Sequence, residues 1–404
     1  MVTIWFYLGV KSQDMNQGKY VFTQIAAFLP GRVFDRCVKH YSGNYYVKHF
    51  KCWNQLLSMM FGQLSGRDSL RDLLISISAH RSKFYHLGFG KNVSRSNLAT
   101  ANEIRDYRIF EELAYEMIAE ARSCCQKDAD FTLSIENPVY AFDSTMIDLC
   151  LSVFWWAEFR KAKAAVKIHT LYDIRTSIPC FIHITDGATH DVHGLDVLTY
   201  EAQGFYILDR GYVDFARLYN IHQHNAYFVT RAKDNFRFIR ISAGNPDKKA
   251  GVTCDQCVKT KGFYSNKHYP DSLRRIRFID IETGRRMVFL TNNFDLPAVD
   301  IALLYKYRWK VELFFKWIKQ HLKVKSFWGN SQNAVKTQIY IAIITYTLVA
   351  IVKSKMKSTL STYEILQILS VSLLDKTPLK DLLANQINQD VKEQNDIQLK
   401  INLI

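Results

Sequence analysis

The chain has 404 residues, 48% of them hydrophobic, which excludes a disordered protein and allows two to four units with their own cores. It carries 53 lysine and arginine residues against 38 aspartate and glutamate residues, a formal net charge of +15. Such an excess favours a polyanionic partner, of which nucleic acid is the commonest.

The first 14 residues differ in pattern from the rest, and we expect translation to begin at Met15. Residues 2–10 lack the basic region and the cleavage site of a signal peptide. The longest apolar run, residues 339–352, is too short to span a bilayer and predicts a buried helix. We therefore expect a cytoplasmic, nucleoid-associated protein with no membrane partner.

Residues 15–130 have a helical pattern and form the first predicted domain. Helices are predicted over residues 20–29, 47–64, 67–78, 97–103 and 109–121. The last two are short and tightly linked, and Lys91, Arg95 and Arg105 lie close by, as in a helix-turn-helix that reads a DNA groove. The alternative is a plain helical bundle whose basic residues only face solvent. We predict a DNA-binding domain.

Residues 131–234 change to a strand pattern with intervening helices, which predicts an α/β sheet. Strands are expected at residues 139–142, 147–153, 165–172, 178–185, 204–208 and 226–230, and helical stretches at 194–201 and 213–223. Residues 235–286 are basic and rich in strand formers and turns, and predict a β-rich insertion. Cys254 and Cys257 in this insertion have metal-knuckle spacing but no second cysteine or histidine pair at a suitable distance.

The sheet resumes at residue 287, so residues 131–234 and 287–355 are predicted to form one core. Residues 356–404 are predicted to be C-terminal helices and a tail. The second part of the core contains Tyr305, Arg308, Glu312 and Lys319, spaced Y-x2-R-x3-E-x6-K. On a helix these four side chains share a stripe about 60° wide. A carboxylate flanked by a phenol and two cations suits a metal-bound phosphodiester, although a solvated charged face has the same pattern.

Two aspartates follow predicted buried strands. Asp143 follows residues 139–142, and Asp209 follows residues 204–208. Such positions lie at the carboxyl edge of an open α/β sheet, where ligands bind. Asp186 is the rival of Asp209, which we prefer because its strand is more apolar and a glycine lies close behind it. Together with Glu312, these hard oxygen ligands suit Mg²⁺ or Mn²⁺, and two ions would support an in-line phosphoryl displacement.

These residues resemble a known family. From Met15 to about residue 375, the chain is similar to DDE transposases of the insertion-sequence group usually called IS-four, whose members carry a Y-R-E-K signature. The first motif is FDST at residues 142–145, the second is LDRGY at residues 208–212, and the third is the complete Y-R-E-K set. The resemblance extends to the branch with a helical N-terminal domain. It implies an RNase H-like catalytic core interrupted by a β-rich insertion.

The resemblance also implies the chemistry. The metal ligands would be Asp143, Asp209 and Glu312. The groups that hold DNA phosphates would be Tyr305, Arg308 and Lys319. Two Mg²⁺ or Mn²⁺ ions, double-stranded DNA from the element's ends and the target, and a homodimer on DNA are expected. The enzyme would hydrolyse DNA at the element's end and join the freed 3′-OH to target DNA.

Relatives release their element through a DNA hairpin, and one stacks a flipped base on a tryptophan of the insertion. This insertion has no tryptophan, and the aromatic candidates are Phe236, Phe238, Phe263, Tyr264 and Tyr269. Two other functions remain open. One is an RNase H-like metal nuclease without strand transfer, and the other is an inactive, domesticated DNA-binding protein.

Overall fold

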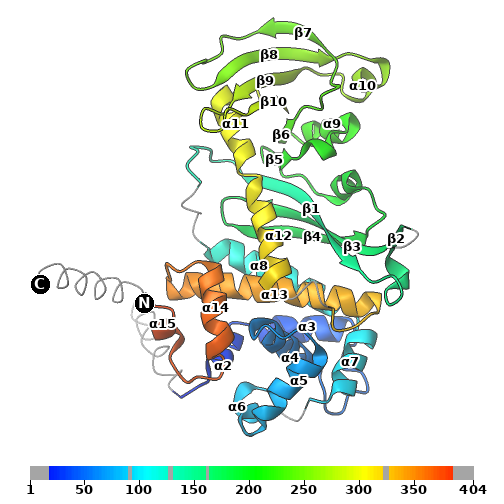
Figure 1. The fold of residues 1–404 in the computed structure, drawn as a ribbon, viewed down its shortest axis with the longest axis vertical. Coiled ribbons are helices and arrows are strands. Elements are labelled where there is room, and N and C mark those ends of the chain that lie inside the picture. The colour runs from blue at the N-terminus through cyan, green and yellow to red at the C-terminus, as the bar shows by residue number, and fades with distance from the viewer. Residues whose placement is uncertain (1–17, 90–92, 126–130, 161–162, 322–326, 385–404) are drawn as a thin grey trace, which may run out of the picture. The chain divides into compact units, whose positions relative to one another are not determined.

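The computed structural model describes residues 18–89, 93–125, 131–160, 163–321 and 327–384 (Figure 1). Met15 and Lys91, which the sequence analysis singled out, lie outside these residues. The chain divides into two compact units. The helical unit comprises Met1–Cys125 and Trp317–Ile404, and the sheet unit comprises Gln126–Lys316.

The sheet unit contains one ten-stranded sheet, in the order β2-β3-β1-β5-β6-β10-β9-β8-β7, with β4 also paired to β3. Its strands are β1 Val139–Leu149, β2 Glu158–Arg160, β3 Lys163–Asp173, β4 Ile178–Asp186, β5 Phe205–Leu208, β6 Tyr227–Arg231, β7 Phe238–Ala243, β8 Val252–Thr260, β9 Leu273–Ile279 and β10 Arg286–Thr291. Strands β4, β3 and β1 are antiparallel, whereas β1, β5 and β6 are parallel. This mixed order is that of an RNase H-like core, and the predicted fold class is confirmed.

The two faces of the sheet are covered by different elements. One face packs against the helix α9 Phe215–Gln223 and the short turns η3 Asp191–Val197 and η4 Arg210–Tyr212. The other face carries α11 Ala298–Lys306, whose Tyr305 ring lies 5.1 Å from the Phe289 ring of β10. The start of α12 Trp309–His321 lies on this face too, because Phe314 packs 5.2 Å from Tyr172 of β3. Figure 1 shows α11 and α12 in yellow, one after the other.

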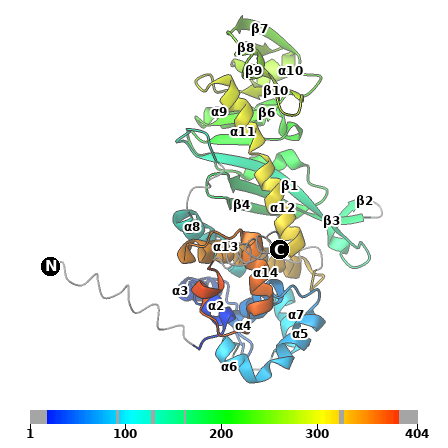
Figure 2. The same cartoon turned by 60° about the vertical axis from the view of Figure 1, so that its left-hand side comes forward.

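The β-rich insertion extends the same sheet. Strands β7, β8 and β9 are antiparallel and join β10, and the short helix α10 Phe263–His268 lies between β8 and β9 in the chain (Figure 2). Cys254 and Cys257 both lie on β8, where an odd separation directs side chains to opposite faces. These two cysteines therefore cannot form one metal knuckle, and both are free thiols.

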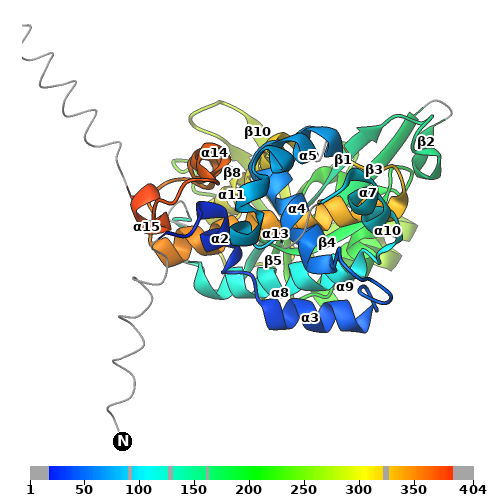
Figure 3. The ribbon, with the colours of Figure 1, turned by 90° about the horizontal axis from the view of Figure 1, so that it is seen from below.

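The helical unit contains more helices than the sequence predicted. Its elements are α2 Val21–Ala26, α3 Gly31–His40, α4 Cys52–Leu64, α5 Leu70–Ala79, η1 Arg81–Lys83, α6 Phe84–Leu87, α7 Arg95–Ile104, α8 Arg108–Cys124, α13 Gln332–Met356, α14 Thr362–Ser372 and α15 Leu379–Leu382. Helices α3 and α6 have no counterpart in the prediction. Figure 3 shows α8 lying between α3 and α13, and it packs on both.

Helix α13 is the centre of the helical unit. By length and composition it could cross a membrane, but 94% of its most apolar stretch is buried inside the protein. A helix that is apolar on all sides is typical of a core helix. The sequence pattern predicts residues 317–355 as part of the catalytic core, whereas the structure groups them with the N-terminal helices. The reason is the packing of α13 on α8, α4 and α7.

A buried polar network holds the helical unit together. Arg105 Nη1 donates to Gln55 Oε1 at 3.0 Å, its Nη2 donates to the Phe50 carbonyl, and Gln55 Nε2 donates to Asn102 Oδ1 at 2.8 Å. Arg105 is only 7% exposed. The expectation that Arg105 contributes to a DNA-facing surface is therefore wrong. Its guanidinium satisfies acceptors inside the core, where an unpaired carbonyl would be costly.

Candidate active site

The register of the sheet places Asp143 beside Asp209. Parallel pairing between β1 and β5 ends at Phe142 and Leu208, so each aspartate is the next residue after one end of that last pair. The sequence pattern predicts Asp143 after the end of a strand, but β1 continues to Leu149 because β3 pairs with it from Tyr140 to Leu149. Asp143 therefore lies within a strand, at the point where its parallel neighbour stops.

The third motif lies on two helices rather than one. Tyr307 and Arg308 link α11 to α12. In this link the Arg308 N–H donates to the Tyr305 carbonyl at 3.1 Å. The Val311 N–H likewise donates to the Arg308 carbonyl at 3.2 Å. These i→i+3 bonds are those of a 3₁₀ turn, which is often a hinge when it interrupts a helix. Tyr305 thus lies in the last turn of α11, Arg308 lies in the link between the helices and Glu312 is in the first turn of α12.

Arg308 connects two of the three carboxylates. Its Nη1 donates to Asp143 Oδ2 at 3.0 Å, and its Nη2 donates to Glu312 Oε1. The exposed fractions of the side chains are 16% for Arg308, 18% for Asp143 and 31% for Glu312, so this ion triplet is partly shielded from water. Arg308 therefore holds a strand carboxylate and a helix carboxylate on either side of one guanidinium.

Asp209 is positioned by three neighbours. Tyr305 donates its hydroxyl proton to Asp209 Oδ1 at 3.1 Å, and the Thr230 hydroxyl donates to the Asp209 carbonyl at 3.3 Å. The Gly211 N–H points to Asp209 Oδ2 at 3.4 Å.

Burial shapes the ionisation of this cluster. It raises the pKa of Asp143 to about 6, and the carboxylates of Glu312 and Asp209 add to the rise while Ser144 and Arg308 oppose it. Burial would lower the pKa of Arg308, but its interactions with Tyr305, Glu312 and Asp143 outweigh burial and raise that pKa. Burial also raises the pKa of Tyr305, to about 12. Arg308 and Tyr305 thus stay protonated near neutral pH, whereas Asp143 is poised to respond to a cation.

A second charged group lies beside β1 and was missed in the sequence. Ser144 donates to Asp191 Oδ1 at 2.7 Å, and the buried Lys167 lies 2.9 Å from the same oxygen. Burial would raise the pKa of Asp191, but the hydrogen bonds from Lys167 and Ser144 hold it below its usual value. By its place in the sequence alone, Asp191 is expected to be a turn former. Its only sequence signal was a lysine at an otherwise apolar position of a predicted strand.

The two remaining candidates have other positions. Asp186, the rival of Asp209, accepts from the Thr189 N–H and hydroxyl, both at 2.8 Å, and so forms a turn at the end of β4. Lys319 lies on α12, two turns after Glu312, within the part of this helix that groups with the helical unit. The structure therefore brings together Asp143, Asp209, Tyr305, Arg308 and Glu312 within the sheet unit.

The donor set fits a hard divalent cation, because its three acidic groups offer only carboxylate oxygens. Among the described residues, no group of three or more His, Cys, Asp or Glu side chains is arranged so that it could hold a metal ion. Arg308 lies between Asp143 and Glu312 and supplies the positive charge there. A metal ion bound to both carboxylates would compete with this guanidinium for their oxygens.

Comparisons with known proteins identify the family of this chain. The family described as "Transposase DDE domain" matches residues 135–348, more than half of the chain, and this range includes every candidate site residue. Residues 17–90 match a domain of unknown function (DUF4372).

Three relatives are named as transposases. One, y4zB of Sinorhizobium fredii, is 32% identical over 63% of this chain and 70% of its own. The relative named for insertion sequence element IS5377 of Geobacillus stearothermophilus is 31% identical over 59% of this chain and 62% of its own. The relative named for element IS4SA of Synechocystis is 26% identical over 68% of this chain and 76% of its own.

Among solved structures, the chain is similar to the piggyBac transposase in a synaptic complex with hairpin DNA. The TM-score is 0.44 at 11% identity, and the match covers 94% of this chain and 86% of that one. The extent of the family match and the identity to y4zB establish the relationship. This chain belongs to the DDE transposase family.

Proposed function

We propose that the cluster of Asp143, Asp209 and Glu312 is the catalytic centre of this DNA-transposing enzyme. The observation that carries the proposal is the position of Arg308, which ties Asp143 of β1 to Glu312 of α12 while Tyr305 ties α11 to Asp209. Three carboxylates from three elements are thereby held at the carboxyl edge of the parallel strands, where α/β enzymes bind substrate.

The three carboxylates would hold two Mg²⁺ or Mn²⁺ ions. Such ions activate the attacking oxygen and stabilise the leaving oxygen of a phosphodiester. Divalent ions are general in this family, and the raised pKa of Asp143 adds a physical argument, because a bound cation favours the ionised carboxylate.

The remaining side chains of the third motif would bind DNA phosphates. If metal ions replace Arg308 at the carboxylates, its planar guanidinium group could bind two phosphate oxygens. Lys319 would supply a point charge two turns further along α12. Tyr305, whose raised pKa keeps its hydroxyl protonated, would donate a hydrogen bond near Asp209.

Two of the five aromatic candidates for stacking on a base are suitably exposed. Tyr269 is fully buried, and Phe236 and Phe238 stack on each other against the core of the sheet unit. Phe263 and Tyr264 of α10 are 78% and 74% exposed and flanked by Lys261 and Lys267. Exposed rings between lysines suit a single-stranded base at the end of the element. We assign the stacking role to Phe263 and Tyr264.

The other parts of the proposal concern assembly. Pairing two DNA ends requires two catalytic centres, so we propose a homodimer on DNA. We propose that the N-terminal helices contribute to DNA binding and that the enzyme acts in the cytoplasm, where bacterial DNA is accessible.

The test is a cleavage assay on labelled duplex DNA that carries the repeats flanking the gene. Wild type and Asp209→Asn are compared with Mg²⁺ and with EDTA. We expect metal-dependent cutting at the repeat boundary and joining of the product to a second duplex, both lost in Asp209→Asn. The exposed Asp234→Asn variant removes a carboxylate outside the cluster and should cut as wild type does.

Each other result has a distinct meaning. Cutting without joining would assign a nuclease rather than a transposase. Binding without cutting in any metal would assign a DNA-binding protein that has lost its chemistry. Cutting by Asp209→Asn at the wild-type rate would remove Asp209 from the catalytic centre.

A further inference from the structure

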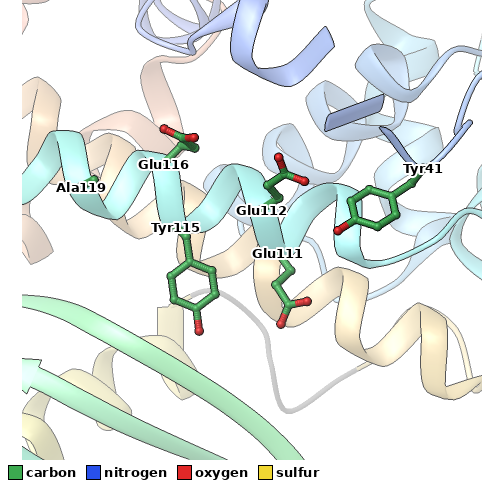
Figure 4. A pocket seen from close by; sticks show the side chains of 6 residues that line it. All are labelled: Tyr41, Glu111, Glu112, Tyr115, Glu116 and Ala119. Carbon is green, nitrogen blue, oxygen red and sulfur yellow. The ribbon is translucent and has the colours of Figure 1, made fainter. Parts of the chain in front are cut away.

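The helical unit carries two surface hollows of similar size and opposite charge. One is a pocket of about 490 Å³ beside α8, the acidic pocket, lined by Tyr41, Glu111, Glu112, Tyr115, Glu116 and Ala119 (Figure 4). The other is a groove of about 550 Å³ between α5 and α7, the basic groove, lined by Arg71, Leu74, Ile75, Ser78, Ala79 and Arg95.

The charges of the acidic pocket are already engaged. Glu112 lies 3.1 Å from His40 and 4.0 Å from Arg36, and Glu116 also pairs with Arg36. Glu111 accepts the hydroxyl proton of Tyr340. These contacts explain the carboxylates as part of the packing of α8 against its neighbours, and the pocket offers no attraction to an anion.

The basic groove is different, because its two arginines are not engaged. Arg71 and Arg95 are exposed, and neither side chain makes an ion pair or a hydrogen bond among the described residues. No carboxylate lines the groove. The nearby Arg67, in contrast, pairs with Asp72 at 3.8 Å. Two guanidinium groups on different helices, both without a partner among the described residues, therefore line one groove. Their positive charge would attract an anionic partner.

The floor of the groove is apolar. Ile75 is 65% exposed although it lies on α5 next to buried leucines, and Leu74 and Ala79 complete the floor. Exposed aliphatic surface between two arginines matches a DNA strand, in which apolar sugars alternate with charged phosphates. The Ser78 hydroxyl adds a group that can hydrogen-bond to phosphate.

We propose that the basic groove binds the sugar–phosphate backbone of duplex DNA, with Arg71 and Arg95 on phosphates and Ile75 against the sugars. The proposal rests on the proposed function in that DNA is the substrate. It goes further by placing Arg71, a residue of the domain of unknown function, on one binding surface with Arg95 of α7, the first helix of the predicted helix-turn-helix. Arg105 has no part in this surface because it is buried.

The test measures DNA binding by the full-length protein at a series of NaCl concentrations. The probe is a fluorescein-labelled duplex of arbitrary sequence, about 30 base pairs or three helical turns long, followed by fluorescence anisotropy. Each phosphate contact contributes about 0.9 to the slope of log K against log [salt]. The Arg71→Gln/Arg95→Gln variant should therefore lower the magnitude of this slope by about 2, and each single variant by about 1.

The matched control is Arg32→Gln/Lys39→Gln, which removes two exposed cations from α3. We expect the control to keep the wild-type slope. An equal decrease in both double variants would overturn the proposal in favour of diffuse electrostatic attraction. An unchanged slope in the Arg71→Gln/Arg95→Gln variant would also overturn it and would leave the groove to an acidic protein partner.

The result is independent of the catalytic proposal. If the catalytic assignment fails, metal-dependent cleavage is absent while the slopes of the groove variants still differ from the control. If the groove assignment fails, cleavage persists and the slopes coincide. Thermal unfolding of each variant checks that the surface changes leave the fold intact.

Discussion

Arg308 of the sheet unit is partly buried and Arg105 of the helical unit is buried, and the two side chains have opposite roles. Arg308 lies between two carboxylates, and its surroundings raise its pKa. Arg105 donates only to the neutral oxygens of Gln55 and Phe50, and burial lowers its pKa. In the sheet unit, Arg308 therefore pairs with carboxylates that a metal ion can also bind. In the helical unit, Arg105 only donates hydrogen bonds to backbone and amide oxygens.

The difference shows what burial of a charge means for function. A buried cation that pairs with carboxylates can be exchanged for a metal ion without leaving an unbalanced charge. A buried cation among neutral acceptors can only be removed, and its removal leaves oxygens without donors. We expect variants in the first region to change activity and metal response, and variants in the second to change stability alone.

The largest effect is expected for Glu312→Gln, which keeps the shape of the side chain but removes its charge. Loss of one metal ligand should cost several kcal/mol of transition-state stabilisation, or about 10³-fold or more in the cleavage rate. Binding of the flanking repeat should persist, because the phosphate-binding side chains remain. Single-turnover cleavage and anisotropy measure the two quantities.

The control for this variant is Glu282→Gln, an exposed change in the turn after β9. It should cleave at the wild-type rate. Cleavage by Glu312→Gln at a comparable rate would show that the third carboxylate is not a metal ligand. The Arg308 cluster would then no longer differ from the surroundings of Arg105 by a role in catalysis.

The next effect concerns Arg308→Gln and is measured by urea unfolding in EDTA. Removing the cation leaves Asp143 and Glu312 as partly buried carboxylates without a partner, which should lower the free energy of unfolding by about 3–5 kcal/mol. Adding Mn²⁺ should stabilise the variant more than the wild type, because no guanidinium has to be displaced.

The matched control is Arg210→Gln, whose partner Asp234 is 95% exposed. It should change the free energy of unfolding by no more than about 0.5 kcal/mol. If Arg308→Gln were as stable as wild type in EDTA, the carboxylates would not depend on Arg308 for charge balance.

His169 on β3 is a third buried basic side chain. Unlike the two arginines, a histidine can lose its positive charge near neutral pH. Burial lowers the pKa of His169 from 6.5 to about 4, so the folded protein contains the neutral ring. Its contribution to stability is present above pH 6.5 and is lost as the pH falls from 6.5 to about 4, because only the unfolded chain binds a proton there. At 1.36 kcal/mol per pKa unit, the loss amounts to about 3 kcal/mol.

Asp143 acts in the opposite sense, because its raised pKa stabilises the folded state as the pH falls from about 6 to 4. The quantity to measure is therefore the difference in the free energy of unfolding between wild type and His169→Phe, in EDTA. This difference should change by about 3 kcal/mol between pH 7 and pH 4. The exposed His190→Gln variant should follow the wild-type curve, and a flat difference for His169→Phe would contradict the assignment.

The sequence predicted the presence of the sheet better than the ends of its strands and the breaks between its helices. The strand pattern and the resemblance predict the RNase H-like core. They do not predict that the half-buried Asp143–Met146 stretch belongs to β1, because its polar side chains conceal the pairing with β3. The break between α11 and α12 has no proline or glycine to announce it. The apolar character of α13 predicted burial, but no periodicity could reveal which unit would bury it.

The candidate site was predictable where spacing and chain order decide the geometry. Asp143 and Asp209 follow from strand register, and Arg308 and Glu312 from a separation of one helical turn. The pairing of Asp191 with Lys167 and the burial of Arg105 depend on contacts between residues distant in the chain. A basic residue near a helix link has the same sequence pattern whether it faces solvent or the core.

The smallest effect is expected for Arg105→Leu, which tests the other half of the comparison. The Gln55 amide oxygen and the Phe50 carbonyl would lose their donor, and unsatisfied buried acceptors cost about 1–3 kcal/mol. The salt dependence of DNA binding should stay as in wild type, because a buried cation contacts no phosphate. The exposed Arg32→Leu variant removes the same charge from α3 and should change the free energy of unfolding by less than about 0.5 kcal/mol. A decrease in the salt slope for Arg105→Leu, with unfolding unchanged, would return this arginine to the DNA-binding surface, because only an accessible cation can release counterions from DNA.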